Sequence, residues 1–581
     1  MAIHPPHEAL DRLPSGTRVL IAGGGPSGLF LALDLAHRGI PSVVVEPRAS
    51  IDPHRPRAKT TNARTMTHLR RLGLADALRA AAPLPVRFSQ DVIFCSGLTG
   101  REITRFPNAF QLDAGRYDAQ PECGQQVPQP VLETVLREAV RSHPLVSLHT
   151  GVTVTGLAPG TGTGAARAPH RVQVEDSAGS RRVVEAEYVV GADGGSSVVR
   201  KSLGIALEGG SAARSNLSVL FRSAQLAELV ELDPAVQYWV MNPQAPGMIG
   251  PANLDGTWWV ILQGVDLSGA DVDLAASIRA MVGAEIDVDI IAEDPWTARM
   301  LLAERYGDGT IFLVGDAAHL NPPWGGHGFN TCIGDAANLA WKLAAEIHGW
   351  GGPGLLASYG AERRPVAQRT IQDAADNGKA LAYDFADERL GEGGPAGDAL
   401  RAEARTALQV KRSEFDSLGL VLGYNYAGSP IVSSDGGLPP QPDPIAYRPS
   451  AAPGCLLPHS WLPDGRSLYD ALGEGFTLLV DADSADEQAP AAVAEPVARM
   501  AAARGVPLEI RAVRAGSGTP LASAWEADFL LVRPDQHVAW RGNDGGSAAE
   551  ALDRATGWAS DSILTGSGNA DRAVDRAGAN A

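Results

Sequence analysis

Three short motifs in this chain combine glycines with an acidic residue. The first is Gly-Gly-Gly-Pro-Ser-Gly at residues 23–28, and Glu46 follows it. The second is Gly-Ala-Asp-Gly at 191–194, and the third is Gly-Asp-Ala-Ala-His at 315–319. Glycines allow a backbone to approach phosphate oxygens closely, and a carboxylate can accept hydrogen bonds from ribose hydroxyls. Residues of these types at this spacing favour dinucleotide binding.

The first motif lies between segments that match a strand and a helix. Residues 18–22 form a short apolar run, and residues 29–38 carry apolar side chains at helical spacing. Gly23 permits a tight turn, Gly25 lets the backbone approach a pyrophosphate, and Gly28 allows helix and strand to pack closely. The N-terminus of the expected helix would direct N–H groups at the phosphates. The alternative is a glycine turn in an ordinary α/β sheet.

Glu46 stands where the second strand of such a βαβ unit would end. Residues 42–45 are predicted to form this strand, since three of the four are valine. The acid follows the glycines by about twenty residues, the spacing at which a carboxylate reaches the ribose of a bound dinucleotide.

Composition limits the class of protein. A chain of 581 residues is too long for one compact core, and two to four domains are expected. The net charge of -18 disfavours nucleic acid as a partner. The four cysteines are widely separated, which predicts neither a disulfide scaffold nor a metal site. No signal-like start and no run of about 18 apolar residues is present, so a cytoplasmic protein without a membrane span is expected.

The remaining sequence predicts both strands and helices. Residues 236–241 and 258–263 are rich in β-branched and aromatic residues, which favours strands. Residues 335–347 and 355–377 are predicted to be helical. A proline-rich connector at 438–454 is expected to precede a smaller α/β segment.

With these motifs in this order, the chain resembles the group A flavin-dependent aromatic hydroxylases, the superfamily of p-hydroxybenzoate, phenol and polyketide hydroxylases. The resemblance covers about residues 16–560. The matching positions are Gly23, Gly25, Gly28 and Glu46 of its FAD fingerprint, Gly191, Asp193, Gly194, Ser196 and Arg200 of a motif that serves FAD and NAD(P)H, and Gly315, Asp316, His319, Pro322 and Pro323 of a motif that holds the ribityl chain. Residues 335–343 and 359–365 match the helices that follow.

The resemblance implies FAD as the bound cofactor and NADPH or NADH as the reductant. The residues that it places around the FAD are Gly23, Gly25, Pro26, Ser27, Gly28, Glu46, Arg57, Gln129, Asp193, Gly315, Asp316, Pro322, Gly325, Gly328 and Asn330. Arg57 matches an arginine near the FAD and its entry loop, and Gln129 matches a glutamine near the flavin. The alternatives are a surface charge for Arg57 and a helix N-terminal residue for Gln129.

The resemblance does not identify the base that would activate a phenol, and two residues are candidates for catalysis. His327 lies in the loop 322–330, where many members have glutamine or leucine between the glycines. It could form a hydrogen bond with substrate or flavin, or simply fill space. Tyr238 alternates with Trp239 along an expected strand, so one of the two should face the pocket.

The implied fold is α/β, with a Rossmann-like FAD-binding domain interleaved with a β-sheet substrate domain. The FAD-binding domain is expected to be discontinuous, with segments 16–85, 128–204 and 301–380. The substrate domain is expected to comprise 86–127 and 205–300, and residues 381–452 a helical segment and linker.

Residues 453–565 resemble the thioredoxin-like C-terminal domain of one subgroup of this family. The positions that carry this resemblance are 453–454, 458–462, 464–467 and 531–535. The segment lacks a Cys-x-x-Cys motif, so packing or oligomerisation is expected of it, rather than thiol redox chemistry.

For a member of this family the implied activity is FAD-dependent, NAD(P)H-consuming monooxygenation. Reduced flavin would capture dioxygen as a flavin hydroperoxide, which would hydroxylate a phenolic or polycyclic, natural-product-like aromatic. Two alternatives stay open: an oxygenase of the same fold that cleaves or rearranges its substrate, or a non-catalytic protein that retains FAD and sequesters a ligand. The expected partners are a small aromatic substrate and dioxygen, and a homo-oligomer stays open.

Overall fold

Two compact units make up the chain. The computed structural model describes residues 10–55, 59–162, 168–265, 273–483, 489–516 and 520–559. The first unit comprises Met1–Trp341, Arg363–Tyr424 and Pro440–Pro449, and the second comprises Lys342–Glu362, Asn425–Pro439 and Ser450–Ala581.

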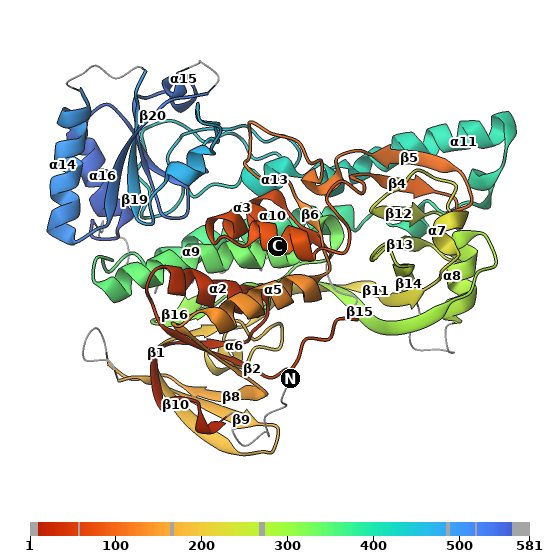
Figure 1. The fold of residues 1–581 in the computed structure, drawn as a ribbon, viewed down its shortest axis with the longest axis horizontal. Coiled ribbons are helices and arrows are strands. Elements are labelled where there is room, and N and C mark those ends of the chain that lie inside the picture. Colours follow the sequence, from red (N-terminus) through yellow and green to blue (C-terminus); the bar gives the residue numbers. More distant parts are fainter. Residues whose placement is uncertain are drawn as a thin grey trace, which may run out of the picture. The chain divides into compact units, whose positions relative to one another are not determined.

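One sheet of the first unit has a parallel centre, and helices α2 (Pro26–His37) and α5 (Gln129–Ser142) lie beside it (Figure 1). Its order is β16-β17-β10-β1-β2-β7, and β9 joins β10 to β8. The strands are β1 (Gly16–Ala22), β2 (Ser42–Glu46), β7 (Val146–Thr150), β8 (Val152–Ala158), β9 (His170–Asp176), β10 (Arg181–Gly191), β16 (Gly307–Asp308) and β17 (Ile311–Leu313). Every residue of β2 is buried, as expected for a parallel strand covered on both faces.

Parallel pairing brings the three glycine–acid motifs to one edge of this sheet. Ala22, the last residue of β1, is level with Val45 of β2. Gly191, the last residue of β10, is level with both Ala22 and Leu313 of β17. Residues that follow the carboxyl ends of these strands therefore lie together, at the edge where open α/β sheets bind ligands.

The second sheet of this unit has the order β18-β15-β11-β14-β13-β12-β4-β5. Its strands are β4 (Val92–Cys95), β5 (Glu102–Phe106), β11 (Leu207–Arg222), β12 (Gln237–Val240), β13 (Gly247–Pro251), β14 (Thr257–Val265), β15 (Asp289–Ala303) and β18 (His319–Leu320). Tyr238 packs on the face that also holds residues of α8 (Leu274–Val282). Trp239 and Trp259 pack in the cluster on the other face. The strand alternation predicted for Tyr238 and Trp239 is confirmed.

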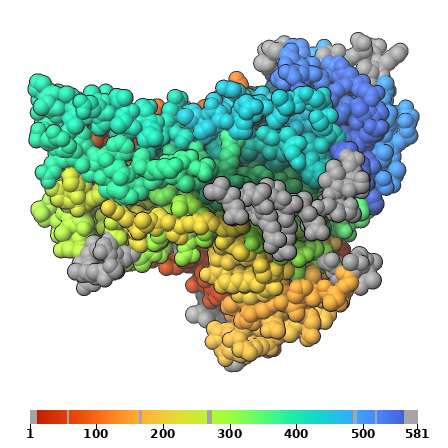
Figure 2. Space-filling view, turned by 180° about the vertical axis from the view of Figure 1, so that it is seen from behind, coloured from red at the N-terminus to blue at the C-terminus, as the bar shows by residue number. Residues whose placement is uncertain are grey.

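Shorter elements complete the first unit. They are β3 (Thr60–Thr61) paired with β6 (Gln125–Gln126), α3 (Ala63–Arg71), α4 (Ala75–Ala81), α6 (Val198–Ser202), α7 (Leu226–Leu229), α11 (Gly394–Ala407), α12 (Arg412–Phe415) and α13 (Leu418–Leu422). Figure 2 shows α11, in turquoise, at the surface. Helices α9 (Gly328–His348) and α10 (Ser358–Asn377) each contribute residues to both units.

The second unit contains a sheet with the order β20-β19-β21-β22. β19 pairs parallel with β20 and antiparallel with β21, which pairs antiparallel with β22. Its elements are β19 (Phe476–Asp481), α14 (Ala489–Arg504), β20 (Leu508–Val513), α15 (Leu521–Trp525), β21 (Phe529–Val532), β22 (Val538–Gly542) and α16 (Gly545–Ala555). The thioredoxin-like assignment and the domain boundaries stay predictions, and residues 560–565 lie outside the described residues.

Within the described ranges, no helix is both long and apolar enough to cross a membrane. The same ranges hold no group of three or more His, Cys, Asp or Glu side chains that could bind a metal ion. Cys95, Cys123, Cys332 and Cys455 are buried free thiols.

Candidate cofactor and substrate site

The first motif forms a tight turn that requires glycine at two positions. Gly23 has a φ of +107°, and a Cβ added there would lie 2.2 Å from the carbonyl oxygen of Ala192. A Cβ on Gly28 would lie 2.0 Å from the carbonyl oxygen of Gly23. Both distances are far shorter than van der Waals contact, so the packing of the turn excludes any residue other than glycine at positions 23 and 28.

Gly25 differs, because a Cβ added there would meet no described atom within 4 Å. It is the N-cap residue of α2, and no side chain caps this helix end. Pro26 takes the first helical position, and Ser27 and Gly28 follow it inside the first turn. The uncapped N–H groups and the helix dipole make this open space suited to an anionic group such as a diphosphate.

Glu46 is held against the same turn. Its Oε2 accepts a hydrogen bond of 2.7 Å from the Gly24 N–H. Its Oε1 accepts hydrogen bonds from the backbone N and the Nε of Arg48, at 2.9 and 2.7 Å. Because a carboxylate offers about four lone-pair positions, Glu46 keeps acceptor capacity for ribose hydroxyls.

Gln129 is connected to this acid through two side chains. Gln129 begins α5, and its Nε2 donates to Glu133 Oε1 at 2.7 Å. The other Glu133 oxygen lies 3.1 Å from Nη1 of Arg48, which also pairs with Glu46. The structure thus brings Gln129 to the first motif, whereas Arg57 lies outside the described residues.

The second motif ends β10 beside the glycine turn. Oδ2 of Asp193 accepts hydrogen bonds from the N–H groups of Val198 and Val199, at 2.7 and 3.2 Å. Its Oδ1 is buried and has no hydrogen-bond partner among the described residues. Burial raises the pKa of this carboxyl. Such an orphaned acceptor is suited to a hydroxyl or N–H group of a bound cofactor.

The third motif meets the other two. A Cβ on Gly315 would lie 2.9 Å from Oγ of Ser27, so the first and third motifs are in contact. Arg200 donates to the carbonyl oxygens of Ala317 and Gly195, at 3.2 and 3.0 Å, which joins the second and third motifs. Asp316 is exposed at the strand end, where its carboxylate can accept hydrogen bonds.

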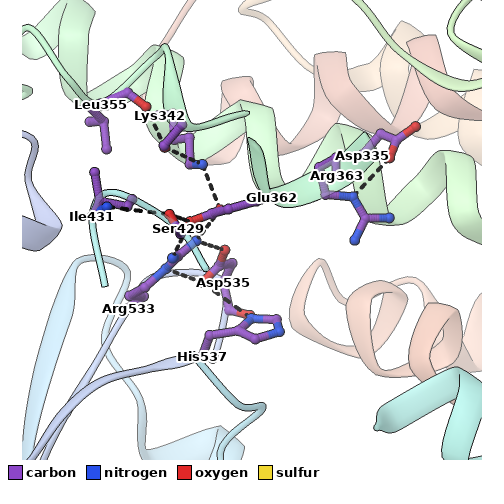
Figure 3. Close-up of polar contacts among 11 residues, drawn as sticks. Asp335, Lys342, Leu355, Glu362, Arg363, Ser429, Ile431, Arg533, Asp535 and His537 are labelled. Carbon is purple, nitrogen blue, oxygen red and sulfur yellow. Dashed lines mark hydrogen bonds and ion pairs between the residues drawn. The ribbon is translucent and has the colours of Figure 1, made fainter. Parts of the chain in front are cut away.

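Asp335 and Arg363 support the third motif, and neither was predicted as a site residue. Asp335 of α9 accepts a hydrogen bond of 3.2 Å from the Gly315 N–H. It also accepts one of 2.8 Å from Arg363 Nε (Figure 3). His319 Nε2 lies 2.8 Å from the same carboxylate. Burial raises the Asp335 pKa, but the charges of His319 and Arg363 outweigh it, and the pKa is lowered. Asp335 therefore stays ionised and holds the motif from behind.

The glycine loop after the third motif is tied to the segment 60–62. Asn330 Nδ2 donates to the carbonyl oxygens of Thr60 and Gly326, at 2.9 and 2.7 Å, and its Oδ1 accepts from the Asn62 N–H at 3.0 Å. Gly325 has a φ of +81°, Pro322 is buried and Gly328 begins α9. Asn330 thus fixes the loop, and its amide is engaged within the protein.

His327 is a buried, neutral histidine in this loop. Its side chain is about 4% exposed, and its Nε2 has no hydrogen-bond partner among the described residues. Burial lowers its pKa to about 4. The unpartnered ring nitrogen can donate or accept one hydrogen bond, according to its tautomer.

Tyr238 lies elsewhere. Its hydroxyl donates to the carbonyl oxygen of Asp233 at 2.9 Å and accepts from the Ala235 N–H at 3.0 Å. Burial raises its pKa to about 12. The structure therefore does not bring Tyr238 together with the glycine loop, and its hydroxyl serves the fold of its own strand.

A cavity of about 270 Å³ lies beside the 60–62 segment. Residues lining it include Lys59, Gln126, Leu220, Trp259 and Ile291. A Cβ on Gly326 would lie 3.2 Å from Cβ of Thr60, so the glycine loop contacts the residue that follows Lys59. Aliphatic and aromatic walls with a few polar groups are typical of small-molecule sites.

Two family models match this sequence. Residues 16–374 match the model of a FAD binding domain. Residues 450–559 match the model of the C-terminal region of aromatic-ring hydroxylases. Together they cover the segments that hold all three motifs and the sheet of the second unit.

Relatives of known activity match over nearly the whole chain. The FAD-dependent monooxygenase apdD of Emericella nidulans is 31% identical over 578 residues, which covers 93% of this chain and 90% of that protein. The 2,4-dichlorophenol 6-monooxygenase of Delftia acidovorans is 31% identical over 576 residues, covering 90% and 94%. The flavin-dependent monooxygenase PieE, solved with FAD and substrate, superposes with a TM-score of 0.83 at 29% identity, covering 94% and 99%.

Proposed function

Because the chain belongs to the FAD-dependent aromatic-ring hydroxylases, it is a flavoprotein monooxygenase, and we propose that it hydroxylates a phenolic or polycyclic aromatic compound. NADH or NADPH serves as the reductant. The observation that carries this function is the meeting of the three motifs at one sheet edge, in register at Ala22 and Gly191. The phenol-acting and substrate-bound relatives support the aromatic substrate class.

The residues at this edge fit FAD in three ways. Open space at Gly25 and the uncapped start of α2 suit the diphosphate. Glu46, which has spare acceptor capacity, suits the adenosine ribose. Asp193 has an orphaned oxygen, and Asp316 is exposed, so both can accept hydrogen bonds from the ribityl side of the cofactor.

When bound, FAD would supply the redox chemistry for hydride transfer from the reduced nicotinamide and for the activation of dioxygen. The chain's own residues position it and shape the reaction space. Arg200 joins the second and third motifs, and Asp335 holds the third motif from behind. The 322–330 loop, held by Asn330, presents backbone N–H groups that can stabilise negative charge, as oriented donors do elsewhere. His327 supplies a neutral hydrogen-bonding nitrogen.

The second unit has a supporting role in this proposal. Its mixed sheet with flanking helices is compatible with a thioredoxin-like domain that packs or promotes a homo-oligomer.

The four buried free thiols of the chain suit a reducing compartment, which supports a cytoplasmic location.

The function is tested with purified protein in two steps. A visible spectrum should show bound flavin, with or without added FAD. NADH and NADPH oxidation is then measured with and without a panel of phenols and quinols, and products are analysed by mass. Aromatic-stimulated oxidation with an oxygenated product is the expected result. Absence of flavin after reconstitution would overturn the assignment.

A further inference from the structure

The cavity beside the 60–62 segment contains a cation over an aromatic ring. Nζ of Lys59 lies 4.2 Å from the centroid of the Trp259 ring. Both residues line the cavity. The contact fixes the ammonium group on an apolar wall, since a cation is attracted to the face of an indole.

Among the described residues, neither polar group of this contact has an acceptor. No described residue forms a hydrogen bond or ion pair with the Lys59 ammonium group, and burial lowers its pKa to about 8. Trp259 is about 3% exposed, and its indole N–H has no hydrogen-bond partner among the described residues. Burying the indole N–H without an acceptor is unfavourable, and the half-buried ammonium group at the cavity wall can pair with an anion that enters the cavity.

The charges around the cavity favour an anion. The basic side chains that line it are His54, Arg55, Lys59 and Arg222. Among the described lining residues, Asp255 provides the one carboxylate, and its Oδ1 is already engaged by the N–H and hydroxyl of Thr257, at 3.1 and 2.7 Å. This local excess of positive charge contrasts with the net charge of -18 of the whole chain.

The cavity also restricts the size and polarity of its ligand. Its volume of about 270 Å³ lies below the roughly 300–1,000 Å³ that is common for drug-sized ligands. The walls include the apolar side chains of Leu220 and Ile291. A compact aromatic body fits such a space better than a whole dinucleotide does.

We propose that Lys59 and Trp259 form a subsite for a carboxylate on the aromatic substrate, so that this enzyme selects aromatic acids over neutral aromatics. The ammonium group of Lys59 and the indole N–H of Trp259 donate to the carboxylate oxygens, and Leu220 and Ile291 contact the ring. The inference rests on the proposed hydroxylase function, because it names the substrate class of that enzyme.

The test compares matched acid and amide ligands. Hydroxylated benzoic, naphthoic and anthracene carboxylic acids are each paired with the corresponding carboxamide, which keeps size and removes charge. Binding to the FAD-loaded enzyme is measured from flavin absorbance, and independently by calorimetry. At least one acid should bind 10-fold or more tightly than its amide. Equal affinity within every pair would overturn the proposal.

Variants assign the preference to the two residues. Lys59→Met should abolish the acid preference and leave amide affinity within about twofold, whereas Lys59→Arg should retain most of it. Trp259→Phe keeps a ring and removes the N–H, and should weaken acid binding alone. A Lys59→Met enzyme that retains the full acid preference would contradict the proposal, and bound flavin with normal thermal unfolding confirms that each variant is folded.

Two further readouts distinguish a carboxylate subsite from a nicotinamide site and from an inactive enzyme. If the subsite instead held the diphosphate of NADH or NADPH, Lys59→Met would raise the KM for that reductant and leave acid affinity unchanged, which contradicts the proposal. Calorimetry needs no flavin chemistry, so an acid preference without aromatic-stimulated turnover would separate a failure of the hydroxylase function from a failure of the subsite.

Discussion

Arg533 and Glu362 form a two-pronged ion pair inside the second unit, and neither side chain is exposed to solvent. Nη1 and Nη2 of Arg533 donate to the two carboxylate oxygens at 2.7 and 2.8 Å (Figure 3). Lys342 Nζ and Ser429 Oγ each donate to the same carboxylate at 2.7 Å. Arg533 also binds Asp535, with a shortest contact of 2.6 Å. Lys342 and Glu362 lie in the two segments that match the family after the third motif, so part of that match reflects the anchoring of α9 and α10 residues in the second unit.

Replacing Glu362 by Gln should destabilise the second unit strongly. The change leaves the buried cations of Arg533 and Lys342 with less compensating charge, and breaking such a pair costs about 3–5 kcal/mol. Urea unfolding followed by hydrogen exchange in the β21 and β22 peptides measures the loss. The control is Glu495→Gln, which breaks the exposed pair with Arg499 and should cost about 0–1 kcal/mol. Equal effects of the two changes would contradict the argument.

The same network predicts that the second unit loses stability in acid. Burial raises the pKa of Glu362, but the charges of Arg533 and Lys342 outweigh it and hold the pKa below its ordinary value of 4.5. The pKa of Asp535 is also lowered, with Arg533 opposing burial. A group with a lowered folded-state pKa contributes stability above its unfolded pKa and loses it as the pH falls. The melting temperature of the second unit should therefore decrease as the pH is lowered below about 4.5. The decrease should be less steep in Glu362→Gln than in the unmodified protein.

Gly25→Ala should lower FAD affinity without disturbing the fold. A Cβ meets no described atom at Gly25, so any loss reports the space that a bound diphosphate would occupy. We expect the dissociation constant for FAD, measured by flavin fluorescence, to rise at least tenfold. Gly210→Ala in β11 is the control, since a Cβ there also meets nothing within 4 Å. Unchanged FAD affinity in Gly25→Ala would place the diphosphate elsewhere.

The glycine turn could be predicted from the sequence because its requirements are local. Gly23 and Gly28 have no room for a Cβ, and their spacing reflects that geometry directly. The following helix begins at Pro26 and ends at His37, whereas 29–38 was predicted. The early start has a physical reason: proline is well accommodated at the first helical position, where its missing N–H is not needed.

The supporting contacts could not be predicted, because they depend on how distant segments pack. Asp335 and Arg363 are 28 positions apart, and no spacing rule joins them. Alternation along the strand correctly placed Tyr238 and Trp239 on opposite faces of the sheet. It could not predict which face adjoins the cavity. Lys59 shows the same limit, since its contact with Trp259 exists only once β14 and the 60–62 segment are packed.

Asp335→Asn should weaken the third motif through two of its neighbours. The amide leaves the buried guanidinium of Arg363 without its counter-charge, which costs about 3–5 kcal/mol. Burial lowers the pKa of His319, but Asp335 outweighs it and raises the pKa above 6.5, so the variant should lower this pKa. NMR titration of His319 and FAD affinity are the readouts. Asp416→Asn, which breaks an exposed pair with Arg412, is the control and should change neither.

His327 should act as a neutral hydrogen-bonding group and not as a base that titrates in the working range. Its pKa of about 4 keeps it uncharged near neutrality, so it contributes no inflection to kcat/KM between about pH 6 and 9. His327→Gln retains hydrogen bonding and should keep NADH oxidation coupled to product formation. His327→Leu removes it and should lower coupling by about two- to tenfold, the effect of one hydrogen bond. A pH-rate inflection that disappears in His327→Gln would show that the histidine does titrate, and unchanged coupling in His327→Leu would show that it only fills space beside Gly325.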